Sequence, residues 1–132
     1  MFLSGKLYYD LVKERSAWGL GELVAFVRIE ELSPFPFWEL EEVVRELKGA
    51  KEFVWVQEEP KNQGAWGHVR VRIGRVLKGV VGRVGDEELG YKGRKESVVS
   101  APGVGRLYVV QREVVDSVFE GLSVGPPYIL IY

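Results

Sequence analysis

The stretch FVWVQEEPKNQGAW, residues 53–66, passes from an apolar run into the densest polar segment of the chain. Phe53–Val56 is a short, continuous apolar run of β-favouring side chains, which predicts a strand buried on both faces. The polar segment follows directly and precedes a predicted helix. In open α/β sheets, ligands and partners bind beyond the carboxyl ends of the strands. We therefore expect a contact site within residues 57–66.

The residues before this stretch predict two strand–helix units. Phe2–Leu3 indicates the end of a strand, and apolar residues at helical spacing from Leu7 onward predict a helix. Leu23–Ile29 is an apolar, β-favouring run that predicts a second strand buried on both faces. Pro36 is well placed as the first residue of the next helix, and Gly49 is a natural stop for it.

Residues 64–80, which follow the central stretch, fit two patterns. Val69–Ile73 alternates like a half-exposed strand, while the apolar residues of the same region also fit a helical stripe. A parallel α/β layout needs a helix that crosses back after each strand, so we expect a helix from about Gly64 to Lys78. Leu89–Gly93 then predicts a short strand.

A last helix is predicted from about Gly105 to Leu122 by its single apolar face. The alternation of strands and helices predicts an α/β fold, in which a mostly parallel sheet carries helices on both faces in three layers. We expect one domain over residues 1–122, with a first strand that is cut short at the start of the chain. Residues 123–132 fit no helix and form an unassigned apolar tail.

Composition excludes several classes of protein. The chain has 132 residues and a mass of 15.0 kDa, which suits one domain, and its 46% apolar content excludes a disordered chain. It has no apolar run of the ~20 residues that a membrane span needs and no signal-peptide pattern, so we expect no membrane partner. The lack of Cys and the single His argue against a transition-metal enzyme. A net charge of −1 argues against a dedicated nucleic-acid binder.

The polar segment supplies most of the candidate contact residues. They are Gln57, Glu58, Glu59, Lys61, Asn62, Gln63 and Trp66. Two adjacent carboxylates can in principle do acid–base work, but the side chains of sequence neighbours diverge, and no second titratable partner can be placed beside them. A structural loop or a partner contact is therefore favoured over catalysis. We expect Trp66 to be a buried anchor where the loop meets the helix.

Basic residues elsewhere have competing explanations. Ser4-Gly5-Lys6 lies at an equivalent strand-to-helix junction, where a tight turn with a solvated lysine is favoured over an anion site. The run that contains Arg70, Arg72, Arg75, Lys78 and Arg83 fits a phosphate or an acidic partner, and it fits a solvated helix face equally well. We expect His68, at the start of this run, to be a surface or capping residue.

Five blocks of the sequence, in order along the chain, resemble one known family. They are FLSGKLYY at 2–9, VRIEELSPFPF at 27–37, VWVQEEPKNQGAW at 54–66, Gly93-Arg94 with Ser97, and Ala101–Gly103. Together they are similar to the C-terminal domain of the thiamine-diphosphate-dependent, decarboxylating component of 2-oxoglutarate dehydrogenase. The sister enzyme that acts on 2-oxoadipate is similarly close. The likeness covers about residues 2–122.

The resemblance implies a transketolase-type C-terminal domain, an α/β sandwich that packs in a homodimer against the domains that carry the cofactor. It also implies a parent oxidoreductase, which decarboxylates a 2-oxo acid on thiamine diphosphate with magnesium and passes the acyl group to the dihydrolipoyl succinyltransferase complex. In the family, an upstream Gly-Asp-Gly motif holds that cofactor, whereas this chain has Gly85-Asp86-Glu87. We therefore expect no catalytic, cofactor-binding or metal-binding residue in this chain, and no turnover by the chain alone.

The same resemblance suggests a regulatory site, because some members of the family bind acetyl-CoA on this domain. Lys51 and Arg94, basic residues beside predicted loops, are the candidates for such a phosphate contact. The leading hypothesis is a fragment that serves as a C-terminal assembly and regulatory domain, in the mitochondrial matrix of a eukaryote or the cytoplasm of a bacterium. The competing hypothesis is a free-standing binding module that contacts a CoA-like anion or a subunit of the complex.

Overall fold

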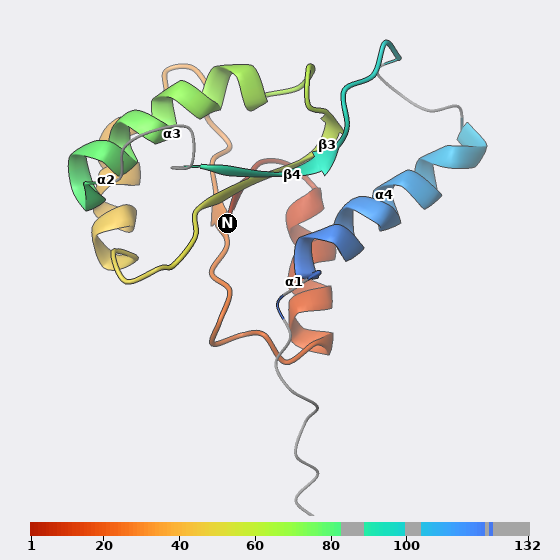
Figure 1. Ribbon diagram of the computed structural model, residues 1–132, viewed down its shortest axis with the longest axis horizontal. Coiled ribbons are helices and arrows are strands. Elements are labelled where there is room, and N and C mark those ends of the chain that lie inside the picture. Colours follow the sequence, from red (N-terminus) through yellow and green to blue (C-terminus); the bar gives the residue numbers. More distant parts are fainter. Residues whose placement is uncertain (83–88, 100–103, 121, 123–132) are drawn as a thin grey trace, which may run out of the picture.

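Strands and helices alternate along the chain in the computed structural model, which describes residues 1–82, 89–99, 104–120 and 122 (Figure 1). The predicted segments Gly85-Asp86-Glu87, Ala101–Gly103 and 123–132 lie outside the described residues. The elements are β1 (Phe2–Leu3), α1 (Leu7–Ala17), β2 (Val27–Arg28), α2 (Phe37–Glu46), β3 (Val54–Pro60), α3 (Trp66–Val81), β4 (Gly90–Arg94) and α4 (Val104–Phe119).

The four described strands form one parallel sheet in the order β2-β1-β3-β4. Helices α2 and α3 cover one face, where Leu40, Val44, Val69 and Ile73 form a core with Phe2 and Trp55. Helices α1 and α4 cover the other face, where their apolar residues pack against Leu3, Val54 and Val56. Successive strand residues point to opposite faces, so β1 and β3 each contribute to both cores. The predicted α/β fold with helices on both faces is confirmed.

The conflict over residues 64–80 is resolved in favour of the helix. α3 buries Val69, Ile73 and Val76 and exposes Val71, which is the helical period and not the strand period. Because β3 and β4 are parallel neighbours, the chain between them has to cross back over the sheet. α3 performs that crossing.

The strand predicted at Leu23–Ile29 is present only at Val27–Arg28, and it is not buried on both faces. Val27–Arg28 pairs with β1 and lies at one edge of the four described strands. Before it, the backbone N–H of Val24 donates to the carbonyl of Leu20 in a turn that buries Val24 and leaves Leu23 68% exposed. A turn beside the α1–α4 layer and a strand in the sheet bury similar apolar residues, so the apolar run alone does not distinguish them.

The third strand is longer than predicted, because β3 continues through Gln57, Glu58 and Glu59 to Pro60. These residues were expected in a loop. They pair with β4, and the register shifts between Gln57 and Pro60 as at a β-bulge. The bulge brings the two backbones close, since a Cβ on Gly93 would lie 2.6 Å from the carbonyl oxygen of Gln57. The apolar run predicts that the strand ends at Val56. The strand instead continues through the polar residues that follow.

Polar contacts from α1 and β4 fix α4 to the rest of the fold. Arg112 pairs with Glu14 of α1 at 2.6 Å, and this hydrogen bond holds the pKa of the Glu14 carboxyl below its usual value. From β4, the Lys92 ammonium donates to the carbonyls of Ser117 and Val118, at 3.1 and 2.9 Å. Lys92 thus satisfies carbonyls at the C-terminal end of α4, where the helix dipole favours a cation.

Replacing Lys92 by Met should keep the aliphatic stem but leave those carbonyls without their donor. We expect the free energy of unfolding in urea to fall by about 1–2 kcal/mol. Lys13→Met, on the exposed side of α1, is the matched control and should change stability by less than about 0.5 kcal/mol. Equal effects of the two substitutions would contradict the assigned role of Lys92.

Candidate functional site

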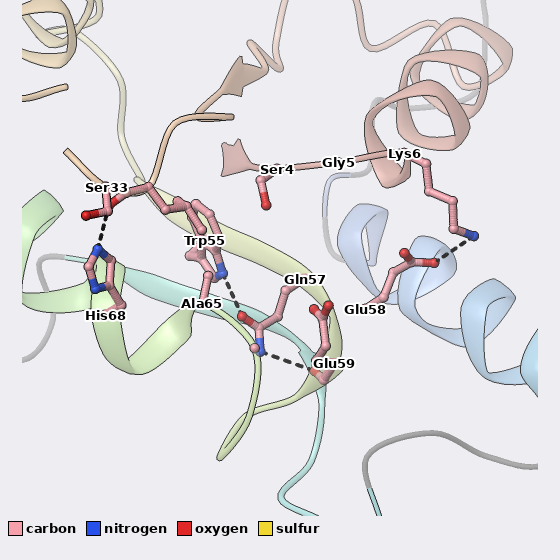
Figure 2. A pocket seen from close by; sticks show the side chains of 12 residues that line it. Ser4, Gly5, Lys6, Ser33, Trp55, Gln57, Glu58, Glu59, Ala65 and His68 are labelled. Carbon is pink, nitrogen blue, oxygen red and sulfur yellow. Dashed lines mark hydrogen bonds and ion pairs between the residues drawn. The ribbon is translucent and has the colours of Figure 1, made fainter. Parts of the chain in front are cut away.

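The carboxyl ends of β1 and β3 form the topological switch point of the sheet. These strands are neighbours, yet the chain leaves β1 for α1 on one face and leaves β3 for α3 on the other. Connections that diverge in this way leave a crevice between them. A cavity of about 500 Å³ opens there (Figure 2), and it is lined by Ser4, Gly5, Lys6, Leu32, Ser33, Trp55, Gln57, Glu58, Glu59, Gly64, Ala65 and His68.

The buried carboxamide of Gln57 is the centre of this edge. Its Oε1 accepts hydrogen bonds from the indole Nε1 of Trp55 and the backbone N–H of Trp66, both at 2.9 Å. Its Nε2 lies within hydrogen-bond distance of three carbonyls, those of Gln63, Pro60 and Glu59, at 2.8, 3.1 and 3.3 Å. Gln57 therefore joins the strand, the loop and the first turn of α3, and it is occupied in holding the fold.

Trp66 is buried at the start of α3, as expected of an anchor. Its ring centroid lies 5.0 Å from that of Tyr91 in β4. The Tyr91 hydroxyl lies 3.0 and 3.2 Å from the carbonyl oxygens of Arg94 and Glu59, and burial raises the pKa of this phenol. The two rings thus close the α2–α3 core at the carboxyl end of the sheet.

Asn62 and Gln63 bind the segment that follows β4. Both side chains donate to the carbonyl of Ser97 at 3.0 Å, and Asn62 Oδ1 accepts the backbone N–H of Ser97 at 3.0 Å. The backbone N–H of Lys61 donates to the carbonyl of Arg94, while the Lys61 ammonium lies 5.5 Å from the centre of the Tyr91 ring. These predicted site residues therefore link the loop after β3 to the loop after β4.

The two carboxylates of the segment diverge, as expected of sequence neighbours. Glu58 forms an ion pair of 3.4 Å with Lys6, whose side chain is 67% exposed, so the pair adds little stability. Glu59 is exposed and lines the cavity beside Gly64, whose φ is +64°. Figure 2 shows the Glu58 side chain pointing toward Lys6 and away from Glu59.

Glu30 and His68 complete the surroundings of the cavity. The Glu30 carboxylate accepts the backbone N–H of Gly5 at 3.1 Å and binds Arg28 at 2.8 Å, so an internal anion already occupies the turn before α1. His68 Nε2 lies 2.8 Å from the carbonyl oxygen of Leu32, which makes this nitrogen a donor. His68 thus holds the loop after β2 against α3.

The chain matches known proteins over most of its length. The family model for the 2-oxoglutarate dehydrogenase C-terminal domain matches residues 1–119. The chain belongs to the 2-oxoglutarate dehydrogenase C-terminal family. It is 40% identical over 119 residues to a 2-oxoglutarate dehydrogenase E1 component of Coxiella burnetii, a match that covers 89% of this chain and 12% of the relative.

Two further relatives of this 2-oxoglutarate dehydrogenase C-terminal domain agree with that assignment. A probable 2-oxoadipate dehydrogenase complex component E1 homolog of Caenorhabditis elegans is 40% identical over 115 residues, which are 87% of this chain and 12% of that protein. A 2-oxoglutarate dehydrogenase E1 component of Azotobacter vinelandii is 43% identical over 110 residues, 83% of this chain and 11% of the relative. The chain spans about one eighth of the curated relatives that it matches.

Lys51 and Arg94, the candidates for a phosphate contact in this C-terminal domain, lie at opposite ends of the sheet. Lys51 is exposed and lies shortly before Val54, the first residue of β3. Arg94 pairs with Pro60, the last residue of β3. A strand rises about 3.3 Å per residue, so β3 alone separates them by roughly 20 Å. The structure does not bring these two residues together.

Residues of the edge that escaped the sequence analysis as site residues include Glu30, Tyr91 and Leu32. Glu30 and the Leu32 carbonyl become relevant only once β2 is placed beside β1. Tyr91 had a signal in the sequence, because it belongs to a predicted strand and is followed by Gly93, the residue that permits close approach of β3. Residues two apart in a strand share a face, and the Tyr91 side chain lies beside the Cβ position of Gly93.

Gln57→Met should remove the acceptor for two N–H groups and the donor for the loop carbonyls while keeping the side-chain volume. We expect a loss of unfolding free energy on the order of 3 kcal/mol or more, measured in urea by Trp fluorescence. Glu59→Gln, a neighbouring substitution at an exposed site, is the control and should stay within about 0.5 kcal/mol. A loss below about 1 kcal/mol for Gln57→Met would show that water replaces the carboxamide.

Gly64→Ala should be strained for two independent reasons. Its φ is +64°, and an added Cβ would lie 2.9 Å from the Cβ of Glu59. We expect a destabilisation of about 1–3 kcal/mol in the same assay. Gly67→Ala has open space around the new Cβ and a helical backbone, so it should be neutral or stabilising by up to about 1 kcal/mol. The reverse order of the two variants would refute this argument.

Proposed function

We propose that the chain acts as an assembly and regulatory domain of a decarboxylating 2-oxo acid dehydrogenase component and makes no bonds itself. Family membership and the small share of the relatives that it spans support this role. The partners proposed from the resemblance are the remainder of that component, as a homodimer, and the dihydrolipoyl succinyltransferase complex. The reaction served is the oxidative decarboxylation of 2-oxoglutarate or 2-oxoadipate.

The observation that carries this proposal is the internal use of the polar block. Gln57, Asn62 and Gln63 all bind groups of this chain, so the block builds a rigid edge where strands, loops and α3 meet. We propose this edge as the docking platform, because a surface whose shape is fixed before a partner arrives loses less conformational freedom on binding. Glu58, Glu59 and Lys61 lie on it with at least partial exposure, and we assign them the contacts to the longer protein.

We assign thiamine diphosphate and magnesium, as the resemblance implies, to the part of the longer relatives that this chain does not cover. Within residues 1–82, 89–99, 104–120 and 122, no three His, Cys, Asp or Glu side chains are grouped as metal ligands. The described residues do not fit the metal-bound diphosphate, and we derive no step through it.

The proposed compartment follows from the relatives. Some of the relatives are named as mitochondrial proteins, and others come from bacteria. We therefore propose the mitochondrial matrix for a eukaryotic source and the cytoplasm for a bacterial source. In the described part of the chain, the helices are too short or too polar to cross a membrane.

A second candidate function is a binding module for a CoA-like anion such as acetyl-CoA. It is favoured by a shallow cavity of about 390 Å³ between β4 and α4, where Arg94 and Lys95 lie side by side in sequence. Arg–phosphate contacts are strong because the guanidinium is charged and planar. In this candidate Arg94 makes the phosphate contact, and Lys51, at the other end of the sheet, lies too far away to share it. Isothermal titration with acetyl-CoA tests it, and no heat at millimolar ligand would exclude it.

The main proposal is tested by complementation. The Coxiella burnetii relative, shortened by the segment that matches this chain, is assayed for 2-oxo acid turnover alone and with the purified chain. We expect the chain to be inert alone, to co-sediment with the shortened enzyme and to restore its turnover. Co-sedimentation without any restored turnover, or no association, would contradict the proposal.

A charge-reversal pair sharpens the experiment. Glu58→Lys combined with Glu59→Lys should lower the restored turnover at least tenfold, because both substitutions lie on the proposed platform. Glu22→Lys, an exposed reversal in the turn after α1, is the matched control and should restore turnover like the parent chain. Circular dichroism shows whether each variant is folded before the comparison is made.

A further inference from the structure

The segment that follows β4 carries two exposed valines. Val98 is 100% exposed and Val99 is 56% exposed. In Figure 1 this segment, drawn in teal, extends past the carboxyl end of the sheet. We call Val98 and Val99 the valine pair. Scattered apolar side chains are normal on a protein surface, so the exposure of the pair does not by itself identify a site.

Two carboxamides of the polar block hold the backbone just before the valine pair. Asn62 Nδ2 donates to the carbonyl of Ser97, and Asn62 Oδ1 accepts the N–H of Ser97, both at 3.0 Å. Gln63 Nε2 donates to the same carbonyl at 3.0 Å. Asn62 therefore binds both backbone groups of Ser97, as a residue of a neighbouring strand does. We call these three hydrogen bonds the Ser97 clamp.

The valine pair is itself tied to the clamped residue. The backbone N–H of Val99 donates to Ser97 Oγ at 3.1 Å. Valine branches at Cβ and has few rotamers, so its side chain loses little conformational freedom on burial. A clamped backbone and stiff side chains both lower the entropic cost of binding. The Ser97 clamp thus fixes the segment that carries the pair before any partner binds.

The charges around the valine pair indicate what kind of partner it fits. Positive and negative side chains are equal in number in the surrounding segments, which contribute Lys61, Arg94 and Lys95 with Glu59, Glu96 and Glu113. A nucleic acid needs an excess of positive charge, and so does an anionic membrane surface. A polypeptide surface with an apolar pocket needs neither. Apolar contact is therefore the recognition that this segment offers.

We propose that the valine pair inserts into an apolar pocket on the part of the longer protein that this chain does not cover. This inference rests on the proposed function, because it names the apolar contact of the docking platform. The clamp residues Asn62 and Gln63 follow Lys61 of that platform directly in sequence. The family match includes residues 98–99, and the chain spans only about one eighth of its relatives, so most of the longer protein is available to form the pocket. Val98 and Val99 make the contact, and Asn62 and Gln63 are positioning residues.

Cysteine labelling tests whether a partner covers the valine pair. The chain has no cysteine, so Val98→Cys introduces a single thiol, and Val71→Cys, at a 69% exposed valine of α3, is the matched control. Each variant is labelled with a maleimide, alone and with the shortened Coxiella burnetii relative, and the mass of the chain is followed. We expect the relative to slow labelling at position 98 by about tenfold or more and to leave position 71 unchanged, because the reaction needs access to the thiol. Unchanged labelling at position 98 within the complex would refute the inference.

A double-mutant cycle tests whether the Ser97 clamp acts through the valine pair. Val98→Ser with Val99→Ser should raise the dissociation constant for the shortened relative by about tenfold or more, since apolar area is buried on binding. Val71→Ser should leave it unchanged. Asn62→Ala should raise it by about threefold or more, because the released segment loses more freedom on binding, and should add nothing in the serine background. A full effect of Asn62→Ala in that background overturns the positioning role, provided that circular dichroism shows each variant to be folded.

The outcomes separate this inference from the proposed function. A parent chain that does not associate with the shortened relative removes the support for both. A parent chain that associates and restores turnover, while the double serine variant binds equally tightly, overturns the inference and leaves the proposed function standing. Self-association of the parent chain that the two serines abolish would assign the valine pair to a second copy and would also overturn the inference.

Discussion

The carboxamide of Gln57 is the interaction on which the carboxyl edge of this domain depends. A polar side chain at a buried strand position is stable only when its hydrogen bonds are satisfied, and here Trp55, Trp66 and the loop carbonyls satisfy them. No other side chain type of this size accepts two N–H groups and donates to carbonyls at once. The bulge, the loop and the start of α3 therefore keep their geometry together.

Helices α1 and α3 leave the carboxyl edge toward opposite faces of the sheet, and this creates the crevice at that edge. Because the chain leaves neighbouring strands toward opposite faces, the sheet carries one core on each side and a crevice between the two departures. Side chains of this chain already accept backbone N–H groups at the starts of both helices. Glu30 accepts the N–H of Gly5 before α1, and Gln57 accepts the N–H of Trp66 in α3. Within residues 57–66, Gln57, Asn62, Gln63 and the backbone of Trp66 thus build this edge through hydrogen bonds to other groups of the chain.

The sequence predicted the layers well because periodicity reports burial. The crossover rule identified α3 although Val69–Ile73 also alternates, and the spacing in α1 and α2 placed those helices. The strand boundaries were predicted less well. At Leu23–Ile29 a turn buries the same kind of residue as a strand does, and at Gln57–Pro60 polar residues belong to the sheet. Three of the contacts join residues far apart in the chain: Gln57 binds Trp66 across 9 residues, Glu30 binds Gly5 across 25, and His68 binds Leu32 across 36, so only the folded chain reveals them. The partner or ligand contacts assigned to the candidate residues stay predictions; these residues are Lys51, Gln57, Glu58, Glu59, Lys61, Asn62, Gln63, Trp66 and Arg94.

The sheet ends in strands that are poor templates for another chain. β2 has two paired residues, and β4 contains Gly90 and Gly93, with Lys92 and Arg94 between and after them. Short, charged or glycine-rich edges offer few aligned backbone groups to an incoming strand. Edge-to-edge growth into larger aggregates is therefore disfavoured at both sides of the sheet. A strand from another chain would therefore find few aligned backbone groups at either edge of the four described strands.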